Sequence, residues 1–462
     1  MNLLRLGLLS MSIAVVLSCG GGGGGGSGGI APPGFAGATT GNASPTPPAS
    51  TGGSSLLAAT DAPTTATATA TATGVGNQGL GGIAATPDSS TTTTAVSGDD
   101  GSGVGSGGTG ITADATGVGA VDGAGSIIVN GLRYSTDSTV ANIEDASGLQ
   151  LGMSVKVTGP VDAGFTSGIA RRVDSAADLR GPLASVDLKQ GSFVVLGTTV
   201  TTDEATVWAD ASGLAALTTG RTLQVWGLPG APGVMRATRI EQRDATTLIL
   251  TGTVQNLDAA SSTFKLGALA VDYRNASLSG SLDGRPLVDG MLVRVRANAA
   301  SAGGLVATSV QWWYPVPMSD GTTAQIAGVV TGYSGMGSFS LIGIPVDASS
   351  TQVTGGPAGS IGNGVKLEVG GVFRGGILRV AKLKIRHVPG TGGPASFNLI
   401  GTVGAFKSPA DFKVRGQPVD ASGPGVAFHN GTAANLGNGV KVNVQGAEVV
   451  NGVLKASDVA FE

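Results

Sequence analysis

Apolar and polar residues alternate along most of the chain beyond residue 113, and the alternation restarts at regular intervals. The clearest case is a ladder in which a glycine precedes apolar residues at every second position. The ladder occurs at residues 152–157, 220–225, 290–295, 364–369 and 439–444. A period of two places alternate side chains on opposite faces of a strand. Each ladder is therefore predicted to be a turn glycine followed by a β-strand, in a unit of roughly 65–75 residues.

Further landmarks keep the same order around each ladder. A Gly-x-Val opening and a strand that ends in a turn glycine come before it, and a closing apolar strand follows it. An aspartate lies between the turn glycine and the ladder, at Asp137, Asp203, Asp272, Asp347 and Asp420. We expect these aspartates to cap turns, because a carboxylate can accept N–H groups two or three residues further on. Five repeats are predicted, at residues 114–178, 179–245, 246–316, 324–388 and 396–462.

Five short strands in each repeat, separated by glycine turns, predict an all-β chain. The 80 glycines argue against helix as the main element. An isolated five-stranded sheet would leave its edges exposed, and closure removes them. We therefore expect five tandem small closed β-barrels. The longer connection between the third and fourth strands resembles that of the oligonucleotide/oligosaccharide-binding (OB) barrel. In that barrel type the connection is a helix, whereas here its sequence is loop-like, so another small barrel or a sandwich stays an alternative.

The first 113 residues have a different composition. Residues 1–18 carry one positive charge, at Arg5, and an apolar stretch too short to cross a bilayer, which is the layout of a signal peptide. Residues 19–113 are rich in Gly, Ser, Thr, Ala and Pro and hold no Lys or Arg. Such a composition cannot bury enough apolar surface to offset the entropy of ordering. A disordered tether is predicted, either unmodified or carrying O-linked glycans.

Cys19, the only cysteine, follows the signal segment directly. Ser18 and the branched apolar residues before it resemble a bacterial lipobox, which implies cleavage before Cys19 and lipid attachment to its thiol. Gly20 in the next position implies sorting to the outer membrane. An unpaired thiol and a buried apolar residue are the alternatives. We expect a lipid-anchored protein of the outer membrane, facing the periplasm or the surface.

The lipobox, the glycine run at residues 20–26 and the repeated Gly-x-Val, Phe-x-x-x-Gly and Gly-x-x-Val-x-Val units resemble bacterial lipoproteins with tandem copies of domain of unknown function 5666. The resemblance covers about 350 residues besides the signal segment. It implies the repeat architecture and brings no catalytic residues with it.

Catalytic chemistry finds little support in the sequence. The two histidines, His387 and His429, lack metal-ligand spacing, and we expect both to be surface imidazoles. The glycine-rich stretch 103–108 matches a dinucleotide motif by letters but lacks the flanking strand and helix that such binding needs. We expect no enzyme activity, no metal and no cofactor.

Two groups of residues are candidates for binding. Trp312, Trp313 and Tyr314 close the third repeat and are expected either to pack between barrels or to offer a platform for sugars. Lys382, Lys384 and Arg386 alternate along the last strand of the fourth repeat, as a solvated face or a site for polyanions.

The charge balance argues against one shared ligand for all repeats. Residues 114–178 hold four basic and eight acidic residues, whereas residues 324–387 hold six basic and two acidic ones. The chain as a whole has a net charge of −3 and few aromatic residues, which disfavours nucleic acid.

Three functions follow as hypotheses. The first is a monomeric, non-catalytic structural or interaction module, held to the membrane by its N-terminal lipid. The second is an adaptor that binds envelope glycan or protein, and the third is capture of nucleic acid at the surface.

Overall fold

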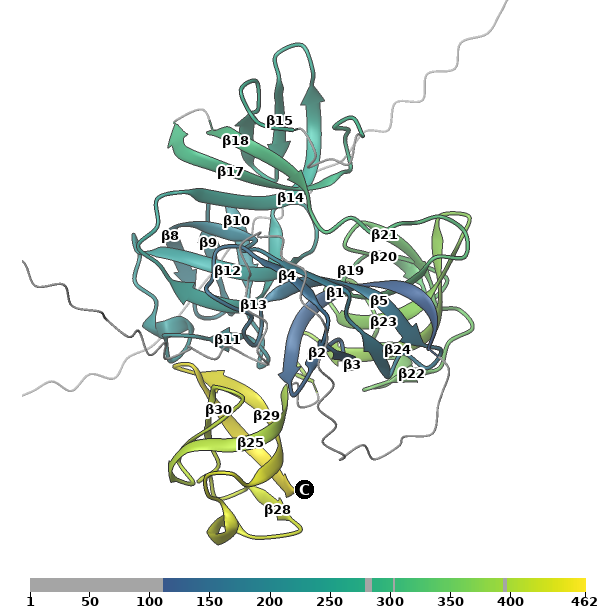
Figure 1. Ribbon diagram of the computed structural model, residues 1–462. Helices are drawn as coiled ribbons and strands as arrows, with labels where there is room; N and C mark the ends of the chain where they lie inside the picture. Colours follow the sequence, from purple (N-terminus) through teal and green to yellow (C-terminus); the bar gives the residue numbers. More distant parts are fainter. Residues whose placement is uncertain (1–110, 279–284, 302–303, 394–396) are drawn as a thin grey trace, which may run out of the picture. The chain divides into compact units, whose positions relative to one another are not determined.

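The computed structural model describes residues 111–462 except 279–284, 302–303 and 394–396 (Figure 1). The predicted signal peptide, Cys19 and the predicted tether up to residue 110 lie outside the described residues. All described residues belong to one compact unit. This part of the chain is built of strands, with three 3₁₀ turns of three residues each among its connections. The all-β prediction is confirmed.

Five segments with related strand patterns follow one another. Segment 1 consists of β1 (Ile111–Ala124), β2 (Ile127–Val129), β3 (Leu132–Ser135), β4 (Val140–Ile143), β5 (Ser154–Asp162), β6 (Ser167–Ile169) and β7 (Arg172–Ser175). Segment 2 consists of β8 (Leu179–Asp187), β9 (Ser192–Val195), β10 (Thr198–Thr201), β11 (Val207–Trp208), β12 (Thr222–Pro229) and β13 (Val234–Gln242). Segment 3 consists of β14 (Leu248–Asp258), β15 (Thr263–Leu266), β16 (Leu269–Asp272), β17 (Leu292–Ser301) and β18 (Gly304–Trp312).

The last two segments follow the same plan. Segment 4 consists of β19 (Thr323–Gly335), β20 (Ser338–Leu341), β21 (Ile344–Asp347), β22 (Val353–Thr354), β23 (Lys366–Arg374) and β24 (Ile377–His387). Segment 5 consists of β25 (Phe397–Ser408), β26 (Asp411–Val414), β27 (Gln417–Asp420), β28 (Ala427–His429), β29 (Lys441–Val450) and β30 (Val453–Phe461). The 3₁₀ turns η2 (Leu214–Ala216), η3 (Ala358–Ser360) and η4 (Ala433–Asn435) lie in the long connections of segments 2, 4 and 5.

The strands pair in the same order in every segment, as segment 5 shows. β25 pairs antiparallel with β26 and with β29, and β26 pairs antiparallel with β27. β27 runs parallel to β30, which pairs antiparallel with β29. These pairings lead from the first strand of a segment back to that strand.

The hairpin between the second and third strands explains the predicted turn glycines. Four of these turns place two successive residues at positive φ, of which the second is glycine. They are Asn130-Gly131, Leu196-Gly197, Ile342-Gly343 and Arg415-Gly416. Two positive φ angles define a type I′ turn, whose twist matches that of the flanking strands. Glycine fits the second position because it has no Cβ to clash there.

Pairings across segments overturn the prediction of five separate closed barrels. β1 runs parallel to β19 at Ala115–Val118 and to β25 at Gly123–Ala124. β8 pairs with β14, and β11 pairs with β29. All 30 described strands thus belong to one hydrogen-bonded network, a β-solenoid of tandem repeats. The physical reason is the length of β1. This strand has 14 residues, and strands of other segments pair with the parts of its edges that segment 1 leaves open.

The core follows the alternation in the ladders. Their inward residues are buried: Val155, Val157, Leu223, Val225, Val293, Val295, Leu367, Val369, Val442 and Val444. Burying one such side chain stabilises the fold by about 1.5–3 kcal/mol. The core is not divided by segment, because one apolar cluster joins segments 1 and 5 and another joins segments 2 and 3. A third cluster, in segment 4, takes in Trp313 and Tyr314.

The five ladder glycines share a positive φ of 79–89° but differ in their surroundings. A Cβ added to Gly152 would lie 2.5 Å from the carbonyl oxygen of Thr238 and 2.7 Å from a methyl group of Val207, both in segment 2. A Cβ added to Gly439 would meet nothing within 4 Å. Gly152 is therefore required for the contact between segments as well as for its turn.

Replacing Gly152 by alanine is expected to lower the free energy of unfolding by about 2–5 kcal/mol, from backbone strain together with overpacking. Gly439→Ala, with the strain alone, is expected to cost about 1–2 kcal/mol. Urea denaturation followed by circular dichroism measures both variants. Equal losses in the two would contradict a contact role for Gly152.

Candidate functional site

The Trp312–Tyr314 cluster begins at the last residue of β18 and lies mostly in the interior. Trp313 is 1% exposed, and its indole Nε1 donates a hydrogen bond of 2.6 Å to Asp178. The Tyr314 hydroxyl donates to the carbonyl oxygen of Ser154 at 3.0 Å and accepts from the backbone N–H of Ala176 at 3.0 Å. Trp312 is only partly buried. Of the three predicted residues, only Trp312 is placed to meet a ligand from solvent.

The Asp178 carboxylate joins three segments. It accepts hydrogen bonds from the Ser154 hydroxyl at 2.6 Å, the Gly227 backbone N–H at 2.8 Å and an Arg294 Nη at 2.8 Å, besides that from Trp313. Its side chain is fully buried, and that of Arg294 is 5% exposed. A buried charge is tolerated only when it is paired and hydrogen-bonded. The arrangement meets both conditions with donors from segments 1, 2 and 3.

A second carboxylate of segment 1, that of Asp145, also joins segments 1, 2 and 3. It pairs with Arg180 of segment 2 at 2.7 Å and with Arg296 of segment 3 at 2.7 Å. Burial would raise the pKa of Asp145, but hydrogen bonds and charges from Arg296 and Arg180 outweigh it and lower the pKa to about 2. Asp145 and Asp178 together form what we call the junction, a charged cluster that holds segments 1, 2 and 3 in contact.

The predicted basic face on β24 does not exist as an open surface. Arg386 is buried and pairs with Asp122 of segment 1 at 3.1 Å and with Glu368 at 3.0 Å. Lys382 donates to the carbonyl oxygen of Phe165 at 2.7 Å, and Lys384 is partly buried. Lys382 and Arg386 both reach segment 1, so another part of this chain covers the face that was predicted to be solvated.

The alternation along β24 is broken at its end. Lys366 pairs with His387 and the next residue, Leu367, pairs with Ile385, so Arg386 is an extra residue in the ladder. Such a bulge changes the direction of the side chains beyond it. Arg386 itself stays on the face of Lys384, because it pairs with Glu368, the residue opposite Lys384, and segment 1 covers that face.

A small polar cavity lies beside this ion pair. Its volume is about 20 Å³, close to the space that one water molecule needs, and Asp122, Lys366 and Glu368 are among its lining residues. The Asp122 Oδ1 atom is buried and has no hydrogen-bond partner among the described residues. Burial raises the pKa of Asp122 to about 6, with a further increase from Glu368 and an opposing effect of Arg386.

The two histidines differ from each other. His429 is exposed, as predicted, with Nε2 2.6 Å from Asp458. His387 is buried, which corrects the surface prediction; its Nδ1 lies 2.9 Å from Glu204 of segment 2, and burial lowers its pKa. Within the described residues no three metal-ligating side chains gather into a cluster.

The repeated aspartates cap turns as predicted in four of the five segments. Asp203, Asp272, Asp347 and Asp420 each accept the backbone N–H of the residue two positions on, at 2.9–3.1 Å. Asp137 instead accepts the hydroxyl of Ser135. Their carboxylates thus serve local structure.

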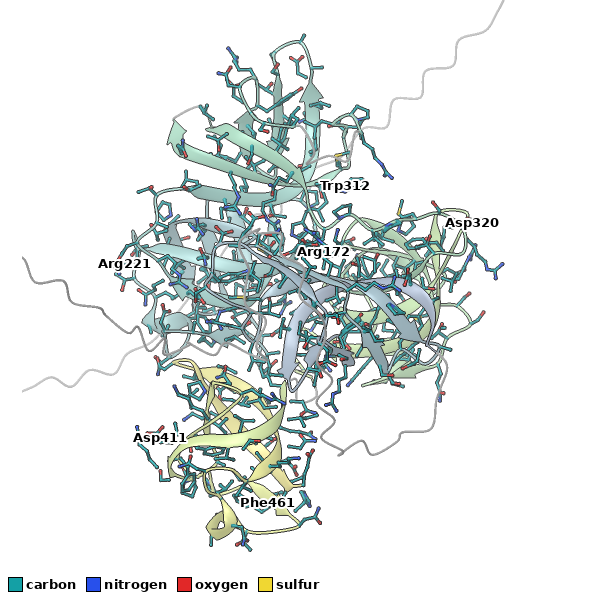
Figure 2. The ribbon with its side chains drawn as sticks, in the orientation of Figure 1. Arg172, Arg221, Trp312, Asp320, Asp411 and Phe461 are labelled. Atoms are coloured by element: carbon teal, nitrogen blue, oxygen red, sulfur yellow. The ribbon has the colours of Figure 1, made fainter. Side chains whose placement is uncertain are left out.

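Two grooves meet at Trp312, which Figure 2 labels together with Arg172. The larger, of about 480 Å³, runs between segments 3 and 4 and is lined mainly by apolar side chains, Val288, Met318 and Ile344 among them. We call it the apolar groove. The smaller, of about 260 Å³, is lined mainly by polar residues, including Arg172. Trp312 belongs to the walls of both.

Sequence reasoning missed most of these residues. Arg294 occupies a polar position of the ladder at residues 290–295 and Arg296 directly follows that ladder, and both face carboxylates of other segments. Asp178 lies at the predicted boundary between repeats, and its position there is the one signal that pointed to a junction. Arg285, which lines the apolar groove, carried no signal in the sequence. Cys19 lies outside the described residues, and none of the described helices is long and apolar enough to span a membrane.

Comparison with known families identifies the repeat. A family model described as domain of unknown function (DUF5666) matches residues 118–174, 180–241, 251–311 and 400–460, which together make up just over half of the chain. The chain thus contains four tandem copies. Segment 4 has no match, although its strands pair in the same order as those of the others. No curated protein matches the chain.

Removing the Asp178 carboxylate tests the junction. We expect Asp178→Ala to lower the free energy of unfolding by about 3–5 kcal/mol, because Arg294 is left buried without its partner. The control is Asp114→Ala, which breaks an ion pair with Arg171 whose side chains are 67% and 63% exposed. That loss should stay below about 1 kcal/mol. Urea denaturation measures both losses. Similar losses would show that the buried ion pair contributes no more to the free energy of unfolding than the exposed one.

The pKa of Asp122 predicts a dependence of stability on pH. Its value near 6 in the folded chain, against 3.8 unfolded, means that the folded state retains the proton longer. Stability from this group is therefore full below pH 3.8 and falls as pH rises to about 6, by about 3 kcal/mol in all.

Asp122→Asn should remove this dependence. Thermal unfolding of the variant and of the unchanged chain, followed at several pH values from 3.5 to 7, gives the difference between them, with Asp114→Asn as an exposed control. A difference that is constant over this range would contradict the assigned role of burial.

Proposed function

The chain belongs to the DUF5666 family, a domain of unknown function, and we propose that it is a lipid-anchored, non-catalytic protein of the bacterial cell envelope. In this proposal the tandem β-segments have a structural or interaction role. Segment 4 is a diverged fifth copy of the repeat, and the chain acts as a monomer.

The junction is the observation that carries this proposal. Asp145, Asp178, Arg180, Arg294 and Arg296 are charged residues, yet each has its partner in another segment. Buried ion pairs of this kind favour one arrangement of the parts that they join. These charged groups hold the segments together, and a fixed arrangement of segments suits a structural scaffold.

The sequence supplies the place of action. The signal segment, Cys19 and the glycine after it support export and a lipid anchor at the outer membrane. Two or three acyl chains hold a protein firmly, since each buried methylene contributes about 0.8 kcal/mol. The stretch from Cys19 to residue 110 would then separate the membrane from the segments.

An adaptor that binds an envelope component is the second candidate. The apolar groove favours it, because a concave, mainly apolar surface of about 480 Å³ has the size of a ligand site. Trp312 in its wall adds an aromatic contact.

Cys19→Ala tests the anchor. We expect the variant to move from the membrane fraction to the soluble fraction and to lose incorporation of labelled palmitate, because the thiol that would carry the lipid is gone. Fractionation of bacteria that produce the chain, with Ser27→Ala as a control that keeps the thiol, measures both effects. Incorporation of labelled palmitate into the Cys19→Ala variant would show that the lipid is attached at another residue.

A further inference from the structure

We propose that the apolar groove binds the hydrocarbon chain of an anionic amphiphile, and that Arg285 at its rim holds the acidic headgroup. The inference deepens the second candidate function above and rests on it. It requires neither the lipid at Cys19 nor a particular cellular location.

The groove exposes large apolar side chains to solvent, and such side chains are usually buried in a folded protein. Val288 and Met318 are 48% and 43% exposed, and they are two of seven large apolar side chains that stand out in this way among the described residues. Both line the same groove, one from the loop before β17 and the other from the stretch before β19. Contiguous exposed apolar side chains mark binding surfaces.

The lining fits an aliphatic chain in its flexibility. Met291 and Met318 contribute unbranched thioether side chains, which adapt to irregular partners. Ile342 and Ile344 flank Gly343 in the turn that forms the wall on segment 4. The groove is thus made by two segments and depends on the contact between them.

A peptide or a glycan suits this groove less well. Among the described residues, its charged lining residues are Arg285 and Asp289, and the Asp289 carboxylate already accepts the backbone N–H of Leu257 at 2.9 Å. Buried peptide groups and sugar hydroxyls need hydrogen-bond partners, and each one left unsatisfied costs about 1–3 kcal/mol. A chain of methylenes has no such groups. The Arg285 guanidinium also covers the Trp312 ring, on which a sugar would stack.

Arg285 supplies the charge. Its guanidinium carbon lies 4.4 Å from the centre of the Trp312 ring, a cation–π contact that holds the side chain at the groove. No carboxylate of the described residues forms an ion pair with it, in contrast to Arg180, Arg294 and Arg296. A guanidinium can bind a carboxylate or a phosphate through two parallel hydrogen bonds. An acidic headgroup next to an apolar chain therefore matches both parts of the site.

Equilibrium dialysis with labelled dodecanoate, below the concentration at which it forms micelles, tests the chain-binding part. The full chain with Cys19→Ala is used, so that no covalent lipid or detergent competes. We expect saturable binding of one molecule, weakened about tenfold or more by either Val288→Asp or Met318→Asp, because each places a charge against the hydrocarbon. Leu188→Asp, at a side chain 62% exposed in segment 2, should leave binding unchanged.

The headgroup is tested by comparing dodecanoate with the uncharged 1-dodecanol. Arg285→Gln should weaken dodecanoate binding about two- to fivefold and leave dodecanol binding unchanged. Circular dichroism melts confirm that each variant is folded. A second reporter, quenching of tryptophan fluorescence by a nitroxide-labelled fatty acid, should fall in amplitude in Trp312→Leu, in which Trp313 remains as the tryptophan of the groove.

Clear outcomes would overturn the inference. Absence of dodecanoate binding, or binding that Val288→Asp, Met318→Asp and Leu188→Asp affect equally, would show that the groove is not the site, and a protein segment would then become the better occupant. Equal losses for dodecanoate and dodecanol in Arg285→Gln would refute the headgroup contact. These results leave the anchor untouched, since palmitate incorporation at Cys19 is measured separately.

Discussion

The arrangement of the segments depends on a carboxylate that has no access to water. Asp178 is fully buried and takes its four donors from segments 1, 2 and 3. A carboxylate that leaves water loses several kcal/mol of hydration, and only well-placed partners restore them. Segments 1, 2 and 3 cannot separate without exposing Asp178 or leaving Arg294 unpaired. Electrostatics therefore decide the placement of modules whose interiors are held by ordinary aliphatic packing.

The strand network has a related effect. Because β1 pairs with strands of segments 4 and 5, its edges are covered by this chain. Open edges are the usual starting point for aggregation of β-proteins, and covering them is one of the devices that avoid it. The shared apolar clusters add packing across the same boundaries. Modules that each look self-contained in sequence thus complete one another in the folded chain.

The sequence could predict what each segment looks like but not how segments meet. Ladder alternation gave the strands, and the turn glycines and the aspartate caps followed from known backbone preferences. The alternation predicts which side chains share a face of a strand, but it does not predict which part of the molecule that face contacts. Arg294 occupies a polar position of its ladder, for example, and is buried against Asp178. The burial of Arg386 could not be predicted for the same reason, because segment 1 covers its face of β24. The groove at Trp312 needs segments 3 and 4 together, so residues of neither alone could reveal it.

The pairing of β1 with β25 bears on the order in which the molecule is completed. Gly123 and Asn398 are neighbours across the sheet yet lie far apart along the chain. Closing so long a loop is slow, and contacts of this kind form late in folding. The edge of β1 at Gly123–Ala124 is therefore open until β25 of segment 5 pairs with it. Until then that end of the strand stays available to wrong partners, so completion of segment 5 also protects segment 1 from misassembly.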